Sequence, residues 1–116
     1  MKSKSPRIVI MSSDLGSIGN TLNPEYSFYA MAELARSYKL SKAAVNMAGA
    51  VFTARYKEDG IRVNVVNPGF RATNLNNHAE QAGKKEDGAL EACRMIVAGE
   101  SNETGTYTEI EGTIPW

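Results

Sequence analysis

Residues 38–66 read YKLSKAAVNMAGAVFTARYKEDGIRVNVV and contain two hydrophobic patterns in succession. In the first, apolar residues recur at three- and four-residue steps, the spacing of one face of a helix; they are Leu40, Ala44, Met47, Ala48, Val51 and Phe52. We predict a helix over about 38–57 that ends at Asp59-Gly60. Residues 61–66 are rich in β-branched side chains and predict a strand, which Asn67-Pro68-Gly69 terminates.

A second strand precedes this segment. Residues 7–11, Arg-Ile-Val-Ile-Met, form a nearly continuous apolar run between Pro6 and Ser12-Ser13. Continuous rather than alternating apolar character is typical of a strand that is buried on both faces of a parallel sheet. A strand, a helix and a strand in this order form a parallel unit with a right-handed crossover. The sequence therefore predicts an α/β fold.

The segment between the first strand and the long helix carries turn signals. Residues 12–23 contain two glycines, three serines and two asparagines, which predict a loop. Asn23-Pro24-Glu25 has the pattern of a helix start, because a capping side chain is followed by proline and then by an acid. Residues 26–36 allow two interpretations, a short helix or an ordered insertion.

The remaining elements follow the second strand of the unit. Residues 74–83 are polar, include His78 and predict a mobile loop. Residues 86–98 predict a second helix, 101–104 a loop, and 105–110 a last strand of alternating character. We find no internal repeat, low-complexity linker or domain boundary, so we predict a single domain.

Composition and charge exclude several functional classes. The chain has 116 residues with 13 Lys plus Arg and 13 Asp plus Glu, so its zero net charge argues against a nucleic acid partner. No apolar run approaches the roughly 20 residues of a membrane-spanning helix, and no signal-peptide core follows the basic opening. Cys93 is the only cysteine, which excludes an internal disulfide and predicts a reducing, cytoplasmic location. Leu, Ile, Val and Phe total 23 of 116 residues, a small core that fits half of a larger fold.

One tyrosine has an unusual neighbour. Of the five tyrosines, only Tyr38 is followed four residues later by a lysine, Lys42. On a helix these two side chains lie on one face, one turn apart. A free tyrosine has a pKa of about 10, and a cation held beside it favours the phenolate and lowers that pKa. Tyr38 is therefore a candidate general acid or base.

Polar residues follow both predicted strands of the parallel unit. Ser13 comes after the first strand, and residues 67–73 come after the second. The carboxyl ends of parallel strands share one edge of a sheet, where open α/β sheets bind ligands. We therefore expect Ser13 and residues 67–73 to face the same crevice.

These segments, in this order, resemble the short-chain dehydrogenase/reductase family. Residues 8–16 resemble its strand-and-serine segment, and Tyr38-Lys39-Leu40-Ser41-Lys42 resembles its Tyr-x-x-Ser-Lys motif. Residues 63–73 resemble its Asn-x-x-x-Pro-Gly-x-x-x-Thr segment, which is matched by Asn64, Pro68, Gly69 and Thr73. Residues 105–116 resemble its last strand and tail, so the resemblance covers nearly the whole chain.

The resemblance implies a role for each matched residue. Tyr38 would give a proton to a substrate carbonyl or take one from an alcohol, and Lys42 would lower the Tyr38 pKa. Ser13 would hold and polarise the carbonyl oxygen; we prefer it to Ser12 because the family places a glycine, here Gly16, three residues after the serine. NAD or NADP would be the cofactor, contacted at the nicotinamide end by Tyr38, Lys42, Pro68, Gly69 and Thr73.

The chain also departs from the family pattern. No two of its ten glycines are two residues apart, so the dinucleotide fingerprint is not present. In the family that Gly-rich turn, an Asn-Asn-Ala-Gly segment and the catalytic asparagine all precede the segment that this chain resembles. The resemblance thus implies that residues 1–116 are a partial NAD(P)-binding Rossmann-fold domain, an incomplete sheet with flanking helices that lacks the cofactor-binding half. The strand over 7–11 would then have an unpaired edge. The Ser13-to-Tyr38 spacing, 38 − 13 = 25 residues, resembles that of carbonyl-reductase-like members, which carry an insertion there.

Two functional hypotheses follow. The first is an oxidoreductase fragment that transfers a hydride between a nicotinamide and a small-molecule carbonyl or alcohol, and either cofactor fits because the residues that distinguish them lie in the absent half. The second is a non-catalytic interaction module that associates through the helix over 38–57, which in the family packs against its counterpart and implies a homo-oligomer. The small residues of 43–50 suit such close packing. A metal site is not expected from one histidine and one cysteine, and a Ser13–His78 hydrolase lacks the Gly-x-Ser-x-Gly turn.

Overall fold

A four-stranded sheet in the order β1-β2-β3-β4 forms the centre of the protein. The strands are β1 (Arg7–Met11), β2 (Arg62–Val66), β3 (Tyr107–Glu109) and β4 (Gly112–Thr113). β1 pairs in parallel with β2 and β2 in parallel with β3, whereas β4 runs antiparallel to β3. The predicted parallel unit is therefore confirmed. Within the described residues, β1 is an edge strand, which agrees with the unpaired edge predicted for the strand over 7–11.

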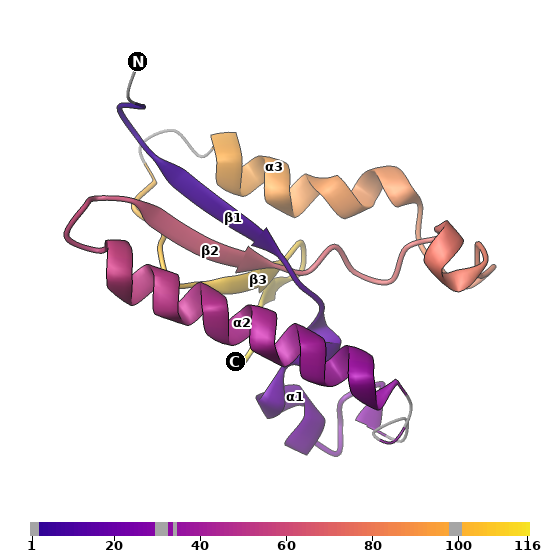
Figure 1. Ribbon diagram of the computed structural model, residues 1–116. Coiled ribbons are helices and arrows are strands. Elements are labelled where there is room, and N and C mark those ends of the chain that lie inside the picture. The colour runs from indigo at the N-terminus through magenta and orange to yellow at the C-terminus, as the bar shows by residue number, and fades with distance from the viewer. Residues whose placement is uncertain (1–2, 30–32, 34, 98–100) are drawn as a thin grey trace.

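Helices cover both faces of this sheet (Figure 1). The computed structural model describes residues 3–29, 33, 35–97 and 101–116. The long helix α2 (Arg36–Tyr56) packs on one face, mainly against β2, and α3 (Leu90–Val97) packs on the other face against β1 and β2. No helix in these described ranges is long and apolar enough to cross a membrane.

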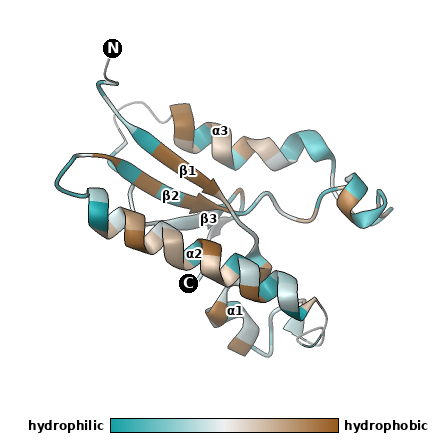
Figure 2. Ribbon diagram, viewed as in Figure 1, coloured by the Kyte–Doolittle hydropathy of each residue, from teal (hydrophilic) through white to brown (hydrophobic). Residues whose placement is uncertain are grey.

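The core is densest around β2. Val63, Val65 and Val66 of β2 have no exposed surface. The strand for which burial on both faces is predicted, β1, is only partly buried and Met11 at its end is 44% exposed, because β1 lies at the edge of the sheet. Val65 packs with Tyr107, Ile114 and Ile10. In Figure 2, β1 and β2 are hydrophobic over most of their length, whereas α2 alternates between hydrophobic and pale segments.

The face that α2 turns toward the sheet differs from the prediction. Apolar residues of the predicted stripe are largely exposed: Leu40 by 72%, Met47 by 62% and Val51 by 53%. The buried residues of α2 are instead Asn46 and Gly49. The reason is close approach, because a Cβ at position 49 would lie 2.3 Å from Cγ2 of Val65.

The segment after β1 is more ordered than the predicted loop over 12–23. It contains the 3₁₀-helix η1 (Asp14–Gly16) and the helix α1 (Ile18–Leu22). Serine side chains cap both, since Ser13 accepts from the Leu15 amide and Ser17 accepts from the Asn20 amide. Ser13 and Ser17, which lie in the loop predicted from the sequence, are therefore helix caps.

The predicted helix start at Asn23 is wrong. Asn23 is the C-cap of α1, and its side chain accepts from the Glu25 amide in a turn. Residues 24–28 form turns and bends. Residues 30–32 and 34 of the predicted 26–36 segment lie outside the described residues.

Downstream, the predicted elements are present with altered bounds. The 74–83 segment contains the 3₁₀-helix η3 (Asn74–Asn76), and the predicted 86–98 helix divides into η4 (Lys85–Ala89) and α3. Residue 98 lies outside the described residues. The last parallel strand is shorter than predicted, and the two-residue β4 is too short to give a periodic pattern.

Candidate active site

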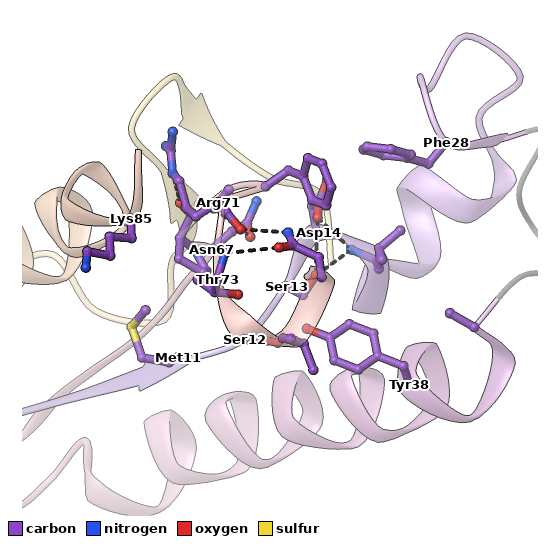
Figure 3. Close-up of a pocket in the computed structure, with 18 of the residues that line it drawn as sticks. Met11, Ser12, Ser13, Asp14, Phe28, Tyr38, Asn67, Arg71, Thr73 and Lys85 are labelled. Atoms are coloured by element: carbon purple, nitrogen blue, oxygen red, sulfur yellow. Dashed lines mark hydrogen bonds between the residues drawn. The ribbon is translucent and has the colours of Figure 1, made fainter. Parts of the chain in front are cut away.

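The carboxyl ends of β1 and β2 open into a cavity of about 1170 Å³ (Figure 3). Five of the six predicted site residues line it, and these are Ser13, Tyr38, Pro68, Gly69 and Thr73. They come from three separate segments, which follow β1, begin α2 and follow β2. The expected crevice at the carboxyl ends of the strands is therefore present.

The sixth predicted residue, Lys42, lies beside Tyr38 instead of on the cavity wall. Its Nζ is 5.6 Å from the centroid of the Tyr38 ring, one helical turn along α2. The Tyr38 hydroxyl points away from α2 toward Ser12 and Ser13 (Figure 3). A cation near the ring of a tyrosine whose hydroxyl faces a cavity is a suitable arrangement for proton transfer.

The two serines after β1 are held differently. The Ser12 hydroxyl donates to Oδ1 of Asn46 on α2 at 2.5 Å, so this side chain joins β1 to the helix. The Ser13 hydroxyl contacts its own turn, accepting from the Leu15 amide and donating to Oδ1 of Asp14, each at 3.3 Å. Both Ser13 contacts are at or beyond the long end of ordinary hydrogen bonds. Ser13 is therefore the serine whose hydroxyl is the more readily available to a ligand.

A tyrosine that sequence reasoning missed fixes the backbone of this turn. The Tyr107 hydroxyl, on β3, donates to the carbonyl oxygen of Ser13 at 2.5 Å. Tyr107 is 1% exposed, and burial raises its pKa to about 12, so the hydroxyl remains a donor. Nothing in its sequence spacing marks it, because its partner lies 94 residues away.

The turn after β2 is built around a buried amide. Asn67 is 3% exposed; its Nδ2 donates to Oε2 of Glu109 at 2.7 Å and its Oδ1 accepts from the Gly69 amide at 3.1 Å. Burial raises the pKa of Glu109. Gly69 has φ of 74°, a conformation that favours glycine and lets the backbone approach the cavity.

Thr73 is fixed by a second asparagine. Oδ1 of Asn76 accepts from the Thr73 amide at 3.0 Å, and Nδ2 of Asn76 donates to the Arg71 carbonyl at 2.7 Å. Arg71 in turn donates through Nε to the Pro68 carbonyl at 2.6 Å. The backbone of 68–73 is therefore held by side chains of its own loop. The sequence predicts Asn67 only as the end of the strand and as part of the 67–73 segment at the crevice, and it gives Asn76 no role beyond the 74–83 loop.

Comparison with known proteins identifies the family of this chain. The family model described as enoyl-(acyl carrier protein) reductase matches residues 1–109. The chain belongs to the short-chain dehydrogenase/reductase family.

This short-chain dehydrogenase/reductase has curated relatives that carry the same family name. It is 32% identical over 107 residues to the short-chain dehydrogenase/reductase eupG of Phoma sp, covering 85% of this chain and 38% of that protein. It is 31% identical over 109 residues to the short-chain dehydrogenase anuI of Penicillium roqueforti, covering 93% of this chain and 43% of that protein. The chain thus spans about two fifths of the length of the curated relatives it matches.

Solved structures show the same partial coverage. The NADPH-bound carbonyl reductase from chicken fatty liver is 25% identical, with a TM-score of 0.73, over 95% of this chain and 42% of that chain. Carbonyl reductase Sniffer of D. melanogaster is 25% identical, with a TM-score of 0.67, over 95% of this chain and 41% of that chain. The fold is an incomplete Rossmann-type fold with a parallel-dominated sheet, as the sequence predicts.

The lining of this family member's cavity suits a flat, partly apolar group such as a nicotinamide. Apolar side chains form much of the wall; they include Met11, Leu15, Phe28, Phe70 and Leu75. Polar lining residues follow β1, begin α2 and follow β2, and they include Ser13, Tyr38 and Thr73. A metal is not similarly supported, because the described residues contain no cluster of three or more His, Cys, Asp or Glu side chains.

Proposed function

We propose that this chain is the catalytic part of a cytoplasmic NAD(P)-dependent oxidoreductase that interconverts a small-molecule carbonyl and an alcohol. The observation that carries the proposal is the convergence of Ser13 and Tyr38 on one cavity with Lys42 beside the Tyr38 ring. The family supplies the reaction class. The proposal extends that class to this chain, which spans about two fifths of its curated relatives.

In the reducing direction Tyr38 acts as the general acid. Its hydroxyl gives a proton to the substrate oxygen as negative charge develops there, and Ser13 donates a hydrogen bond to the same oxygen. Tyr38 is left as a phenolate, and Lys42 lies beside its ring one turn along α2. In the oxidising direction the same phenolate takes the proton from the alcohol. The nicotinamide, when bound, supplies or accepts the hydride.

The cofactor would be NAD or NADP, with its nicotinamide end against the turn after β2. Pro68, Gly69 and Thr73 line the cavity there, and the hydrogen bonds within this turn hold their backbone in a fixed conformation. Lys42 would reach the nicotinamide ribose from α2. These contacts concern one end of a dinucleotide, so we expect weak binding by this chain alone.

Calorimetric titration with NADH and with NADPH tests the proposal, with circular dichroism to show that the chain is folded. We expect binding that Thr73→Val weakens. Reduction of benzaldehyde, followed by loss of the reduced nicotinamide absorbance, then tests the reaction. Tyr38→Phe should lower its rate by about 10² to 10⁴, the usual contribution of a general acid. A folded chain that binds neither cofactor would contradict the proposal.

A second candidate function is association through α2. Leu40, Met47 and Val51 are exposed on its outer side, where they suit a helix of a second copy. Sedimentation velocity over a range of chain concentrations tests for the homo-oligomer that this candidate requires. A monomer at all concentrations would eliminate it.

A further inference from the structure

The carboxylate of Asp14 sits between the candidate catalytic serine and the segment that separates α1 from α2. Its Oδ1 accepts from the Leu15 amide at 3.0 Å and from the Ser13 hydroxyl at 3.3 Å. Its Oδ2 accepts from the Tyr26 hydroxyl at 2.5 Å. Asp14 lines the cavity beside Ser13 (Figure 3). Tyr26 is not among the lining residues and reaches the site through its bond to Asp14.

Tyr26 is suited to remain a hydrogen-bond donor. It is partly buried, and its ring packs edge-on against Phe28, a cavity-lining residue, with centroids 5.6 Å apart. Burial raises the pKa of Tyr26, and its bond to the Asp14 carboxylate raises it further. Both effects favour the protonated hydroxyl, which is the form that donates to Asp14.

Without the hydrogen bond from Tyr26, the Asp14 carboxylate would compete with a substrate carbonyl oxygen for the Ser13 hydroxyl. Hydrogen bonds to a charged acceptor are roughly twice as strong as neutral ones. A free Asp14 would draw the Ser13 hydrogen toward itself, and that hydrogen would then be withheld from a substrate oxygen. The observed long contact of 3.3 Å shows that Asp14, engaged by Tyr26 and Leu15, does not hold Ser13 tightly.

We propose that Tyr26 and Asp14 are positioning residues for Ser13. Tyr26 occupies the Asp14 carboxylate, which keeps the Ser13 hydroxyl free to donate to a substrate carbonyl oxygen. This inference rests on the function proposed for Ser13. It gives the segment between α1 and α2 a part in catalysis, through a residue that touches neither substrate nor cofactor.

The test is a double-mutant cycle on the whole chain, with benzaldehyde as substrate and NADH or NADPH as cofactor. Tyr26→Phe keeps the ring and removes the hydroxyl; we expect kcat to fall about fivefold with the Kd of the cofactor unchanged. Adding Asp14→Asn replaces the charged acceptor with a weaker neutral one and should restore kcat to within about twofold of the original chain. Tyr29→Phe, at a tyrosine of the same segment that is 43% exposed, is the matched control and should have no effect.

The rescue separates positioning from a merely structural role. If Tyr26 and Asp14 only support the fold, the double variant will be slower than either single variant, and the inference is wrong. Absence of turnover in the original chain would count against the proposed function and not against the Tyr26–Asp14 contact. In that case nuclear magnetic resonance tests the contact itself. The Leu15 amide resonance should then move in Tyr26→Phe and remain unchanged in Tyr29→Phe. An unmoved Leu15 resonance in Tyr26→Phe would overturn the inference, with or without turnover.

Discussion

The two sides of α2 differ in a way that reverses the usual relation between hydrophobicity and burial. The side toward the sheet buries Asn46 and Gly49, whereas the outer side exposes Leu40, Met47 and Val51. On the inner side, Gly49 allows a close approach because the sheet lies too near for a larger side chain, and Asn46 accepts a hydrogen bond from Ser12. The outer side carries the exposed apolar side chains on which the proposed association through α2 rests. Hydrophobic periodicity therefore identifies an apolar face without saying what covers it.

The largest expected effect comes from enlarging the inner side. Gly49→Leu places a side chain where even a Cβ would meet Cγ2 of Val65 at 2.3 Å. We expect the free energy of unfolding to fall by about 3 kcal/mol or more, the upper part of the range for overpacking. Urea denaturation followed by circular dichroism measures the change.

The matched control for this substitution is Ala54→Leu, on an exposed position of the same helix. It should change stability by less than about 0.5 kcal/mol. If Gly49→Leu does not fold, Gly49→Ala reports the same clash at smaller size. Equal stability of Gly49→Leu and Ala54→Leu would show that α2 does not approach the sheet as described.

The next effect concerns α3, which also buries a polar residue against the sheet. Glu91 is 3% exposed and accepts hydrogen bonds from Thr108 on β3 and from Arg94 at 2.8 and 2.9 Å. Arg94→Ala leaves this carboxylate without its cation. Breaking a fully buried pair costs about 3–5 kcal/mol in the free energy of unfolding. Because the Arg94 side chain is 45% exposed and screened by solvent, we expect Arg94→Ala to lower the free energy of unfolding by about 2 kcal/mol in urea denaturation.

The same pair predicts a pH dependence. The hydrogen bond from Arg94, the largest cause, holds the pKa of Glu91 below its ordinary 4.5. Because the folded pKa lies below the unfolded one, the stabilisation is complete above pH 4.5 and is lost as the pH falls toward the folded value. Chemical denaturation at neutral and at acidic pH should therefore show a smaller difference between the original chain and Arg94→Ala at acidic pH. A difference that grows on acidification would contradict this assignment.

A smaller effect tests the support of the Ser13 turn. Tyr107→Phe keeps the ring in the core and removes one of the two donors to the Ser13 carbonyl, which then keeps only the Gly16 amide at 2.8 Å. We expect a loss of about 1 kcal/mol in the free energy of unfolding, the usual net contribution of one hydrogen bond. Tyr56→Phe, on a tyrosine at the far end of α2, provides the control and should be near neutral. An unchanged stability in Tyr107→Phe would show that the Gly16 amide alone satisfies the Ser13 carbonyl and that the bond from Tyr107 does not support the turn.

The parts of the fold that sequence predicts are those recorded in local patterns. The strands over 7–11 and 61–66 follow from continuous β-branched runs, and the Tyr38–Lys42 pair follows from helical spacing. Their meeting at one cavity follows from the rule that parallel strands share their carboxyl ends. These inferences need no knowledge of which distant residues touch.

The parts that sequence does not predict depend on such distant contacts. Tyr107 reaches Ser13 across 94 positions, and Tyr26 reaches Asp14 across 12, with no periodicity that links the partners. The residues on the inner side of α2 are not predicted for the same reason. Gly49 is buried because Val65 of β2 lies against it, and its own hydrophobicity does not indicate this contact. Serine caps at Ser13 and Ser17 were local but ambiguous, because serine is common in both loops and caps.

The smallest expected change in folding stability comes from the outer side of α2, and it distinguishes the two functions. Met47→Gln replaces a 62% exposed apolar side chain with a polar one of similar length and helix propensity. As a surface change it should alter the free energy of unfolding of the monomer by less than about 0.5 kcal/mol. If α2 associates with a second copy, the same change should weaken the dimer by tenfold or more in sedimentation, since it places a polar group in an apolar contact at a cost of about 1–3 kcal/mol. Cofactor binding should be unaffected because Met47 is not among the cavity-lining residues. Loss of cofactor binding in Met47→Gln without loss of association would mean that the outer side of α2 supports the active site and is not a contact between copies.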